Sequence, residues 1–405
     1  MQPRVRALFG NAALALGSTL LALLAVELGL RLLPERPTKN RLDLYTRFDP
    51  LLGWAKTPGA AARFELREYT VDMRINDKGL RDRPRDYAPA PGAQRVLALG
   101  DSFTEGLGVE EEQGWTRVLE TGLRKEGCAG SEVVNGGTSG YSTDQESLFY
   151  SSEGARYGAS VVVLTFFYND VLQNIDPTRY RRAKPLFVFE GDQLVLSNTP
   201  LPPPRSDEPL PAAEQADDAP PPRGSAALRF LESRLRYGAP VVHTRFAALG
   251  LWPALEAGET PRVFKVYRRR PIPEVTEAWR MTRALLRDLN ADVQRRGARL
   301  LVVYIPHRLE VNQATWQHFC LMLGWNDGNT ERDGLARRLR EIARDVGFEM
   351  LDLTPAFQQA DRAWTSNPYY LQDEHWTPVG HRTAAREIER VLRGPGWLRC
   401  APGSD

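Results

Sequence analysis

The stretch "VLALGDSFTEGLG", Val96–Gly108, places a short apolar run directly before the residues Gly-Asp-Ser. The run, residues 96–99, contains no polar side chain, which is typical of a strand buried on both faces of a parallel sheet. Open α/β sheets bind their ligands at the carboxyl ends of such strands. The stretch therefore predicts a parallel sheet with Ser102 at its functional edge.

The rest of the chain repeats the alternation of apolar strand and helix. This order is typical of βαβ units and predicts an α/β fold, a three-layer sandwich with a central parallel sheet, over residues 93–400. The further strands are expected in 132–137, 160–170, 299–306 and 348–355, and the helices in 114–127, 145–158, 274–297, 334–347 and after Thr377.

Two segments depart from this alternation. Residues 34–92 are mixed, and "YTVDMRIN" (69–76) alternates apolar and polar residues as a half-solvated strand does, so we expect a small β-containing lead-in. Residues 198–225 are rich in proline and acidic residues and nearly lack large apolar ones. Such a composition cannot bury enough surface to fold and predicts a disordered insertion.

The first residues of the chain read as a membrane anchor. Ala12–Leu30 contains only one ionisable residue, Glu27, and about 20 apolar residues suffice to cross a bilayer as a helix. No small-residue cleavage site follows, so we expect a cytoplasmic tail at 1–8 and an uncleaved signal anchor at 9–33. Basic residues both precede and follow the span (Arg4, Arg6; then Arg31, Arg36, Lys39, Arg41), so the charge count does not favour export of the bulk of the chain.

Charge and cysteine content restrict the partners of the protein. The chain has 53 Lys and Arg against 51 Asp and Glu, which gives no argument for a nucleic acid or another polyanion. Cys128, Cys320 and Cys400 form no CxxC pair, so a metal site of that kind is not expected. In an oxidising compartment two of them could pair, and the sequence does not say which.

A serine nucleophile needs a base that takes its proton and donors that stabilise an oxyanion. In "DEHWTP", Thr377 and Pro378 are a good helix start, so Asp373 and His375 lie in the loop before a helix. Their spacing lets the carboxylate reach one imidazole nitrogen while the other faces a nucleophile. The alternative is that Asp373 caps the helix and His375 is a surface residue.

Two further loops follow strand-like segments and supply candidate oxyanion donors. "NGGTSGYST" contains Gly140, whose backbone N–H can approach an oxyanion without steric cost, and Asn169 ends "VVVLTFFYN" with a side-chain amide. The remaining histidines have other expected roles. His307 follows a strand and is a rival base, and His381, His243 and His318 lie in helical contexts and are expected to be structural.

Together these residues resemble the four blocks of the SGNH/GDSL hydrolase superfamily, which supply a Ser, a Gly, an Asn and a His. The resemblance covers roughly residues 71–392 and implies a flavodoxin-like fold with Ser102, Asp373 and His375 as catalytic residues. It implies an oxyanion hole of Ser102, Gly140 and Asn169 and no metal or organic cofactor. Two departures are Phe167, where the family usually has glycine, and the single residue between Asp373 and His375.

The resemblance also indicates a function and a location. "DEHW" is similar to periplasmic polysaccharide O-acetyltransferases of the alginate type, and "INDKGLRD" (75–82) to membrane-anchored bacterial members. It implies a serine esterase or acyltransferase acting on O-acyl (acetyl) groups of cell-envelope or extracellular glycans, or on another small ester, with an acyl-enzyme on Ser102. It places the protein in the inner membrane as a single-pass protein with an extracytoplasmic catalytic domain. The alternative is a catalytically silent glycan-binding protein that uses the same cleft.

Overall fold

The computed structural model describes residues 3–32, residues 42–204 apart from 181, scattered positions from 225 to 249, and residues 262–400 apart from 324, 327 and 363–366. The chain divides into two compact units. The smaller comprises Met1–Thr38 and Pro209–Glu256, and the larger comprises Lys39–Glu208 and Ala257–Asp405. The expected lead-in thus belongs, from Lys39 onward, to the same unit as the expected hydrolase-like domain.

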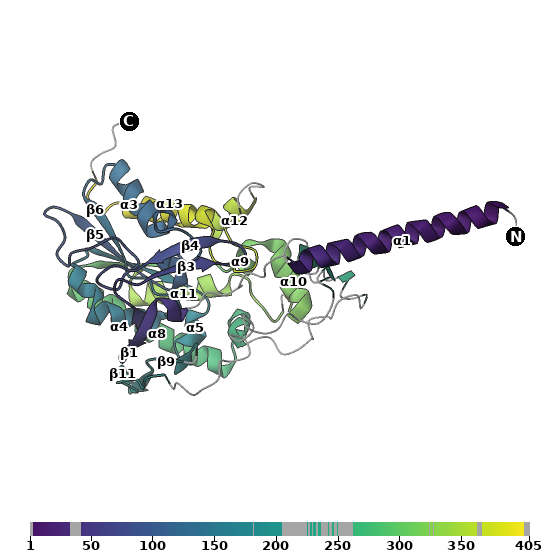
Figure 1. The fold of residues 1–405 in the computed structure, drawn as a ribbon. Helices are drawn as coiled ribbons and strands as arrows, with labels where there is room; N and C mark the ends of the chain where they lie inside the picture. Colours follow the sequence, from purple (N-terminus) through teal and green to yellow (C-terminus); the bar gives the residue numbers. More distant parts are fainter. Residues whose placement is uncertain are drawn as a thin grey trace. The chain divides into compact units, whose positions relative to one another are not determined.

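The larger unit is built on a five-stranded sheet in which every neighbouring pair is parallel (Figure 1). In space the strands are ordered β13-β12-β7-β5-β6. If these five strands are numbered from 1 to 5 along the chain, starting with β5, their order in space is 5-4-3-1-2. This is the flavodoxin-like order of doubly wound sheets. The predicted fold class is confirmed. The strands are β5 (Gln94–Leu99), β6 (Ser131–Asn135), β7 (Val161–Phe166), β12 (Arg299–Tyr304) and β13 (Glu349–Asp352).

Helices cover both faces of this sheet and complete the three layers (Figure 1). On one face lie α3 (Trp115–Lys125), α12 (Thr354–Arg362) and α13 (Pro378–Leu392). On the other lie α4 (Thr143–Ser152), α8 (Pro273–Arg295) and α11 (Gly334–Val346). The described part of the unit also contains the helical elements η1 (Leu42–Leu44), α2 (Ser102–Glu105), η2 (Glu111–Gln113), η3 (Gly154–Tyr157), α5 (Asp170–Gln173), η5 (Arg262–Tyr267), α9 (Arg308–Val311) and α10 (Gln313–Leu323).

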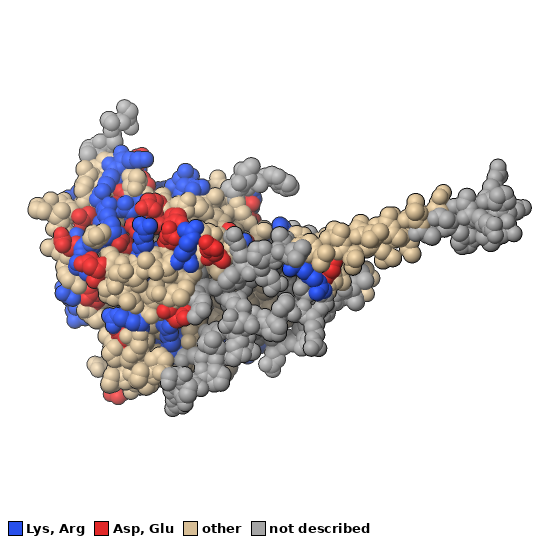
Figure 2. Space-filling view, in the orientation of Figure 1, with Lys and Arg blue, Asp and Glu red and all other residues tan. Residues whose placement is uncertain are grey.

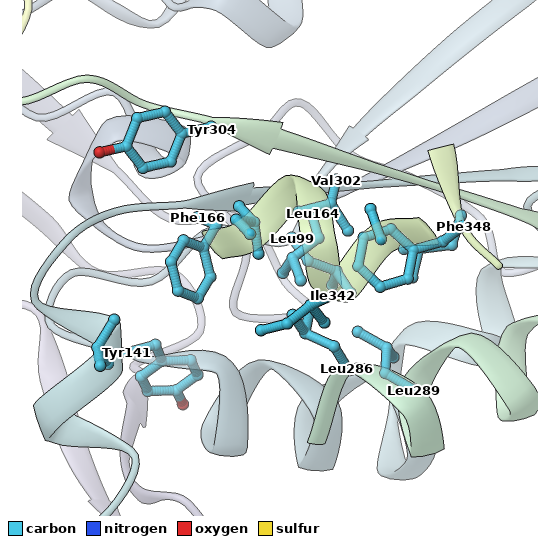
Figure 3. Close-up of a cluster of buried hydrophobic side chains, with 14 of the residues drawn as sticks. Leu99, Tyr141, Leu164, Phe166, Leu286, Leu289, Val302, Tyr304, Ile342 and Phe348 are labelled. Atoms are coloured by element: carbon cyan, nitrogen blue, oxygen red, sulfur yellow. The ribbon is translucent and has the colours of Figure 1, made fainter. Parts of the chain in front are cut away.

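Successive residues of each strand point to opposite faces, which gives the sheet two apolar cores. In β5, Leu97 and Leu99 belong to the core beneath α8, whereas Val96 and Ala98 belong to the core beneath α3 and α13. Figure 3 shows Leu99 and Leu286 of α8 within the first core. Burying each such large side chain contributes roughly 1.5–3 kcal/mol, which is why the run without polar residues becomes a central strand.

The lead-in consists of two hairpins outside the large sheet. β1 (Thr46–Asp49) pairs with β2 (Gly53–Lys56), and β3 (Ala61–Glu65) pairs with β4 (Thr70–Arg74), both antiparallel. β4 confirms the half-solvated strand expected at 69–76, because its valine and methionine are buried and its ends are exposed.

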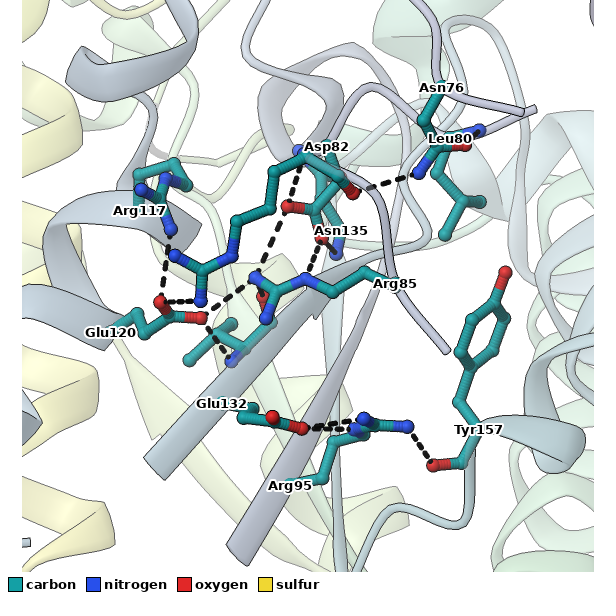
Figure 4. Close-up of polar contacts among 12 residues, drawn as sticks. Asn76, Leu80, Asp82, Arg85, Arg95, Arg117, Glu120, Glu132, Asn135 and Tyr157 are labelled. Carbon is teal, nitrogen blue, oxygen red and sulfur yellow. Dashed lines mark hydrogen bonds and ion pairs between the residues drawn. The ribbon is translucent and has the colours of Figure 1, made fainter. Parts of the chain in front are cut away.

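A buried ion network ties the segment after β4 to the sheet (Figure 4). The Arg85 guanidinium bonds to the Asp82 carboxylate at 3.0 Å and to the Glu120 carboxylate at 2.7 Å. It also donates to the carbonyl of Val133 in β6, and Asp82 accepts the N–H of Asn135. The charges of all three side chains are therefore paired although the side chains are buried, as buried charges must be.

The region between β7 and the insertion predicted at 198–225 has regular structure that the sequence did not predict. It contains α5 (Asp170–Gln173), the hairpin β8 (Thr178–Arg179) with β9 (Arg182–Ala183), and the hairpin β10 (Phe187–Glu190) with β11 (Gln193–Leu196). Residues 198–204, expected to be disordered, are ordered. The side chain of Leu201 is buried and its N–H donates to the carbonyl of Pro50. The buried Leu201 thus outweighs the proline-rich composition of residues 198–204. Residues 205–224 of the expected insertion lie outside the described residues.

A disulfide joins Cys128, in the turn before β6, to Cys400, near the C-terminus. Cys320 is half-buried and is not part of a disulfide among the described residues. The structure thereby selects one of the pairings that the sequence left open.

The smaller unit contains α1 (Pro3–Leu32). Its segment Leu14–Arg31 has a mean hydropathy of 1.6, and none of that segment is buried. Figure 2 shows uncharged side chains along most of its described length, whereas basic and acidic residues are interspersed over the visible face of the larger unit. The helix is long and apolar enough to cross a membrane, and it also includes residues 3–8 of the expected cytoplasmic tail.

Candidate active site

The turn after β5 exposes Ser102 at the carboxyl edge of the sheet. Gly100 has φ +151°, and a Cβ there would lie 2.0 Å from the Thr165 hydroxyl oxygen, so no other residue fits this position. Asp101 caps the short helix α2 (Ser102–Glu105) by accepting the Phe103 N–H at 2.9 Å. Asp101 therefore has an ordinary capping role. Ser102 is half-buried at the start of the helix, and its hydroxyl faces the loop before α13.

That loop brings His375 and Asp373 to Ser102. The hydroxyl oxygen of Ser102 lies 2.7 Å from Nε2 of His375, and Nδ1 of His375 is hydrogen-bonded to Oδ1 of Asp373. The helix cap is instead Thr377, whose hydroxyl accepts the N–H of Val379. The carboxylate therefore pairs with the imidazole and does not cap the helix.

The charges around His375 favour its protonated form. Burial lowers the pKa of His375, but the charge and hydrogen bond of Asp373, with a contribution from Asp101, raise it above the ordinary value of 6.5. Burial raises the pKa of Asp373, but His375 and a hydrogen bond from Tyr69 outweigh it, so that pKa is lowered. Burial also raises the pKa of Asp101 to about 6.

Gly140 lies in the turn after β6, next to the turn that carries Ser102. The loop is fixed there because the Thr138 N–H donates to the Gly100 carbonyl at 2.9 Å. Gly140 is buried with φ +81°, and a Cβ would lie 2.3 Å from the Tyr180 ring. Glycine is thus required both by the backbone conformation and by the aromatic ring against it.

Asn169 follows β7, the strand on the other side of β5. It is half-buried at the start of α5, and its Oδ1 is buried without a hydrogen-bond partner among the described residues. Phe167, which stands where the family usually has glycine, packs its ring 4.8 Å from Phe103 and stacks on His307. The larger residue is accommodated because it fills space between two other aromatic rings.

Direct contacts thus join Ser102, His375 and Asp373. Gly140 and Asn169 lie at the same edge through the order β7-β5-β6. Within the described part of the chain, neither forms a hydrogen bond to the other three.

The family model of the GDSL-like lipase/acylhydrolase family matches residues 98–383, which is more than half of the chain. The chain belongs to the GDSL-like lipase/acylhydrolase family. It is therefore an enzyme of the SGNH serine hydrolase class.

Comparisons with individual proteins give weaker similarity. A segment of 123 residues, 30% of this chain, is 32% identical to the alginate biosynthesis protein AlgX of Pseudomonas aeruginosa, and it spans only 24% of that protein's length. A catalytic mutant of Axe2, an acetylxylan esterase from Geobacillus stearothermophilus, has 15% identity and a TM-score of 0.39 over 76% of this chain and 97% of its own. A lipolytic protein of the G-D-S-L family from Desulfitobacterium hafniense has 10% identity and a TM-score of 0.34 over 74% and 99%.

The other histidines of this GDSL-family chain have contacts of their own. Nδ1 of His307, the rival base, accepts the Leu309 N–H, and its Nε2 lies 3.3 Å from the Glu374 carboxylate. His381 is fully buried in α13, where its Nδ1 accepts the N–H of Trp115. His318 is buried in α10, and His243 lies outside the described residues. Among the described residues, no three His, Cys, Asp or Glu side chains are arranged to hold a metal ion.

Two residues of the lead-in hold the Gly140 loop and were not foreseen from the sequence. The Trp54 indole N–H donates to the Ser139 carbonyl at 3.0 Å, and the Lys56 ammonium donates to the Thr138 hydroxyl at 2.8 Å and to the Gly137 carbonyl. Burial lowers the pKa of Lys56 to about 8, against the opposing effect of Glu105. No motif marks these residues, since each is a single position in a short strand.

Proposed function

We propose that the protein is a serine esterase or acyltransferase that forms an acyl-enzyme on Ser102 and acts on O-acyl, chiefly acetyl, groups of cell-envelope or extracellular glycans. The observation that carries this proposal is the 2.7 Å contact between the Ser102 hydroxyl and Nε2 of His375, with Asp373 on the other ring nitrogen. This is the arrangement in which a base takes the proton of a serine as it attacks a carbonyl.

The reaction proceeds in two halves. His375 takes the Ser102 proton as the oxygen attacks the ester carbonyl, and the tetrahedral intermediate expels the alcohol, which receives that proton. Water or a sugar hydroxyl then attacks the acyl-enzyme, with His375 again as base, and Ser102 is released. Asp373 orients the imidazole and stabilises its charged form, and the amides of Ser102 and Gly140 with the Asn169 side chain bind the oxyanion.

In the second half of the reaction the acyl group is transferred either to water or to a sugar hydroxyl. The loop sequence "DEHW" is similar to periplasmic polysaccharide O-acetyltransferases, and the AlgX segment belongs to a protein named for alginate biosynthesis. Both favour a sugar hydroxyl over water as acceptor. The competing function is a catalytically silent glycan-binding protein, against which the paired Ser102, His375 and Asp373 argue.

The Ser102→Ala variant should lose hydrolysis of short p-nitrophenyl esters and of acetylated sugars, because no other group replaces the nucleophile. A fluorophosphonate probe should label the wild type and fail to label the variant. Ser151→Ala removes an exposed hydroxyl elsewhere and should behave as wild type. Wild-type protein that remains unlabelled at every pH would favour the glycan-binding function.

The Asn169→Ala variant should lower kcat by about 10²–10³ with KM nearly unchanged, since an oxyanion donor acts mainly in the transition state. Asn169→Asp has nearly the same shape but places a negative charge against the oxyanion, so its loss should be at least as large. Steady-state kinetics on p-nitrophenyl acetate measures both. A raised KM with unchanged kcat would make Asn169 a ground-state binding residue.

The pH dependence of kcat/KM should show an acid limb above pH 6.5, because only neutral His375 can take the proton and its pKa is raised. Asp373→Asn removes the charge that raises this pKa, so the limb should move to lower pH while kcat falls by up to about 10⁴-fold. His307→Ala should leave both unchanged. An acid limb that stays in place in Asp373→Asn would contradict the pairing.

We further propose that α1 anchors the protein in the inner membrane with the larger unit on the extracytoplasmic side. The length and composition of α1 support an anchor, and the Cys128–Cys400 disulfide supports an oxidising compartment. Arg31 in the last turn of the helix and the basic residues that follow in the sequence (Arg36, Lys39, Arg41) count against this orientation.

A fusion of alkaline phosphatase near Lys39 should be active, because that enzyme needs an oxidising exterior. The full-length protein should remain with the inner membrane after a carbonate wash. A reporter that functions only in the cytoplasm should be inactive at the same junction. Activity of that cytoplasmic reporter at the junction near Lys39 would overturn the proposed extracytoplasmic location and weaken the case for a glycan acceptor.

A further inference from the structure

The turn between β3 and β4 contacts the loop that carries Asp373, although it precedes the segment matched by the family, 98–383. The buried Tyr69 donates its phenol proton to Oδ2 of Asp373 at 2.8 Å. The other oxygen of the same carboxylate, Oδ1, faces His375. Both carboxylate oxygens therefore have a fixed partner.

Glu68, next to Tyr69, holds the backbone of that loop. One of its carboxylate oxygens accepts the N–H of Leu371 at 2.7 Å, and the other accepts the N–H groups of Gln372 and Asp373, each at 2.8 Å. Hydrogen bonds from backbone N–H groups to an ionised carboxylate are stronger than neutral ones. Three successive residues, ending at Asp373, are thus fixed by one side chain.

The loop is closed on itself and fixed to the turn after α2. The Tyr370 N–H donates to the carbonyl of His375 at 2.8 Å, and the Tyr370 hydroxyl donates to the carbonyl of Gly108. The rings of Tyr69 and Tyr370 lie 4.9 Å apart. A shift of the β3–β4 turn would therefore move Asp373 relative to both Ser102 and His375.

We propose that Glu68 and Tyr69 are positioning residues that hold Asp373 in the orientation that pairs it with His375. The inference rests on the proposed function of Ser102, His375 and Asp373. Rotation of the Asp373 carboxylate away from Nδ1 would break the Tyr69 bond, and displacement of its backbone would break the Glu68 bonds. The two residues thus oppose the two motions that separate the acid from the imidazole.

The decisive variant is Tyr69→Phe in the full-length protein, compared with Tyr87→Phe. Tyr87 is a matched control, because its phenol also donates to a carboxylate, Glu153, at 2.6 Å, but away from the loop. For hydrolysis of p-nitrophenyl acetate we expect kcat of Tyr69→Phe to fall by about tenfold with KM unchanged, which corresponds to about 1.4 kcal/mol. Tyr87→Phe should retain wild-type kinetics.

The pH profile separates positioning from a general loss of stability. In the wild type the phenol shares the charge of the Asp373 carboxylate with His375. In Tyr69→Phe the phenol hydroxyl is absent, so more of the Asp373 charge acts on the imidazole. The pKa of His375 therefore rises, and the acid limb of kcat/KM moves to higher pH. The rate of fluorophosphonate labelling of Ser102 against pH should show the same shift without dependence on a substrate.

Glu68→Gln tests the backbone contacts, with Glu65→Gln on the same hairpin as control. Glu65 is exposed and pairs only with Arg63 among the described residues. We expect Glu68→Gln to lower kcat severalfold and to leave the thermal midpoint close to that of Glu65→Gln.

A wild-type kcat and pH profile in Tyr69→Phe would overturn the inference while Ser102→Ala remains inactive. Equal losses in Tyr69→Phe and Tyr87→Phe without a pH shift would overturn it too, since they indicate a structural role. Turnover retained by Ser102→Ala would instead overturn the proposed function, and the inference with it.

Discussion

The hydrogen bond between Ser102 and His375 joins residues 273 positions apart in the chain, and the architecture is arranged around it. The two are brought together because β5 is an interior strand of the parallel sheet, between β7 and β6, and α13 packs on α3, which follows β5. Phe103 reinforces this, since its ring lies 5.0 Å from the His375 ring and 4.9 Å from the buried Trp376. Phe103 and Trp376, which directly follow Ser102 and His375, thus belong to one apolar core. That shared core fixes the distance between Ser102 and His375.

The electrostatics of the site follow from the same placement. A half-buried imidazole is disfavoured in its charged form, whereas the adjacent carboxylates of Asp373 and Asp101 favour it, and the carboxylates prevail. The serine proton therefore moves toward a base whose charged form is already stabilised before the substrate arrives. Preorganisation of this kind costs no rearrangement during the reaction, which is why it lowers the barrier.

Much of the fold and of the site could be predicted, for identifiable reasons. Apolar runs such as 96–99 report burial on both faces, and Asp373 and His375 lie two residues apart before a strong helix start at Thr377, so their local geometry is encoded locally. Contacts made by single residues far apart in the chain carry no such signal. Trp54 meets Ser139 across 85 positions and Tyr69 meets Asp373 across 304. The alternation at 69–76, which begins with Tyr69, predicts a strand but says nothing of this distant partner. Leu201 was missed for a related reason, since one buried leucine does not change the composition of its proline-rich segment.

The lead-in is accordingly part of the catalytic unit and not a spacer between helix and enzyme. Glu105 ends α2, the short helix that begins with Ser102, and it is almost fully buried. Its carboxylate accepts hydrogen bonds from the Tyr45 hydroxyl and the Ser139 N–H, and the Lys56 ammonium lies 4.0 Å away. Tyr45 and Lys56 belong to the lead-in. Without it, Glu105 would lose its buried cation, and an unpaired buried charge is among the most destabilising changes that a fold can undergo. The physical unit that holds Ser102 in place therefore begins well before the segment that defines the family.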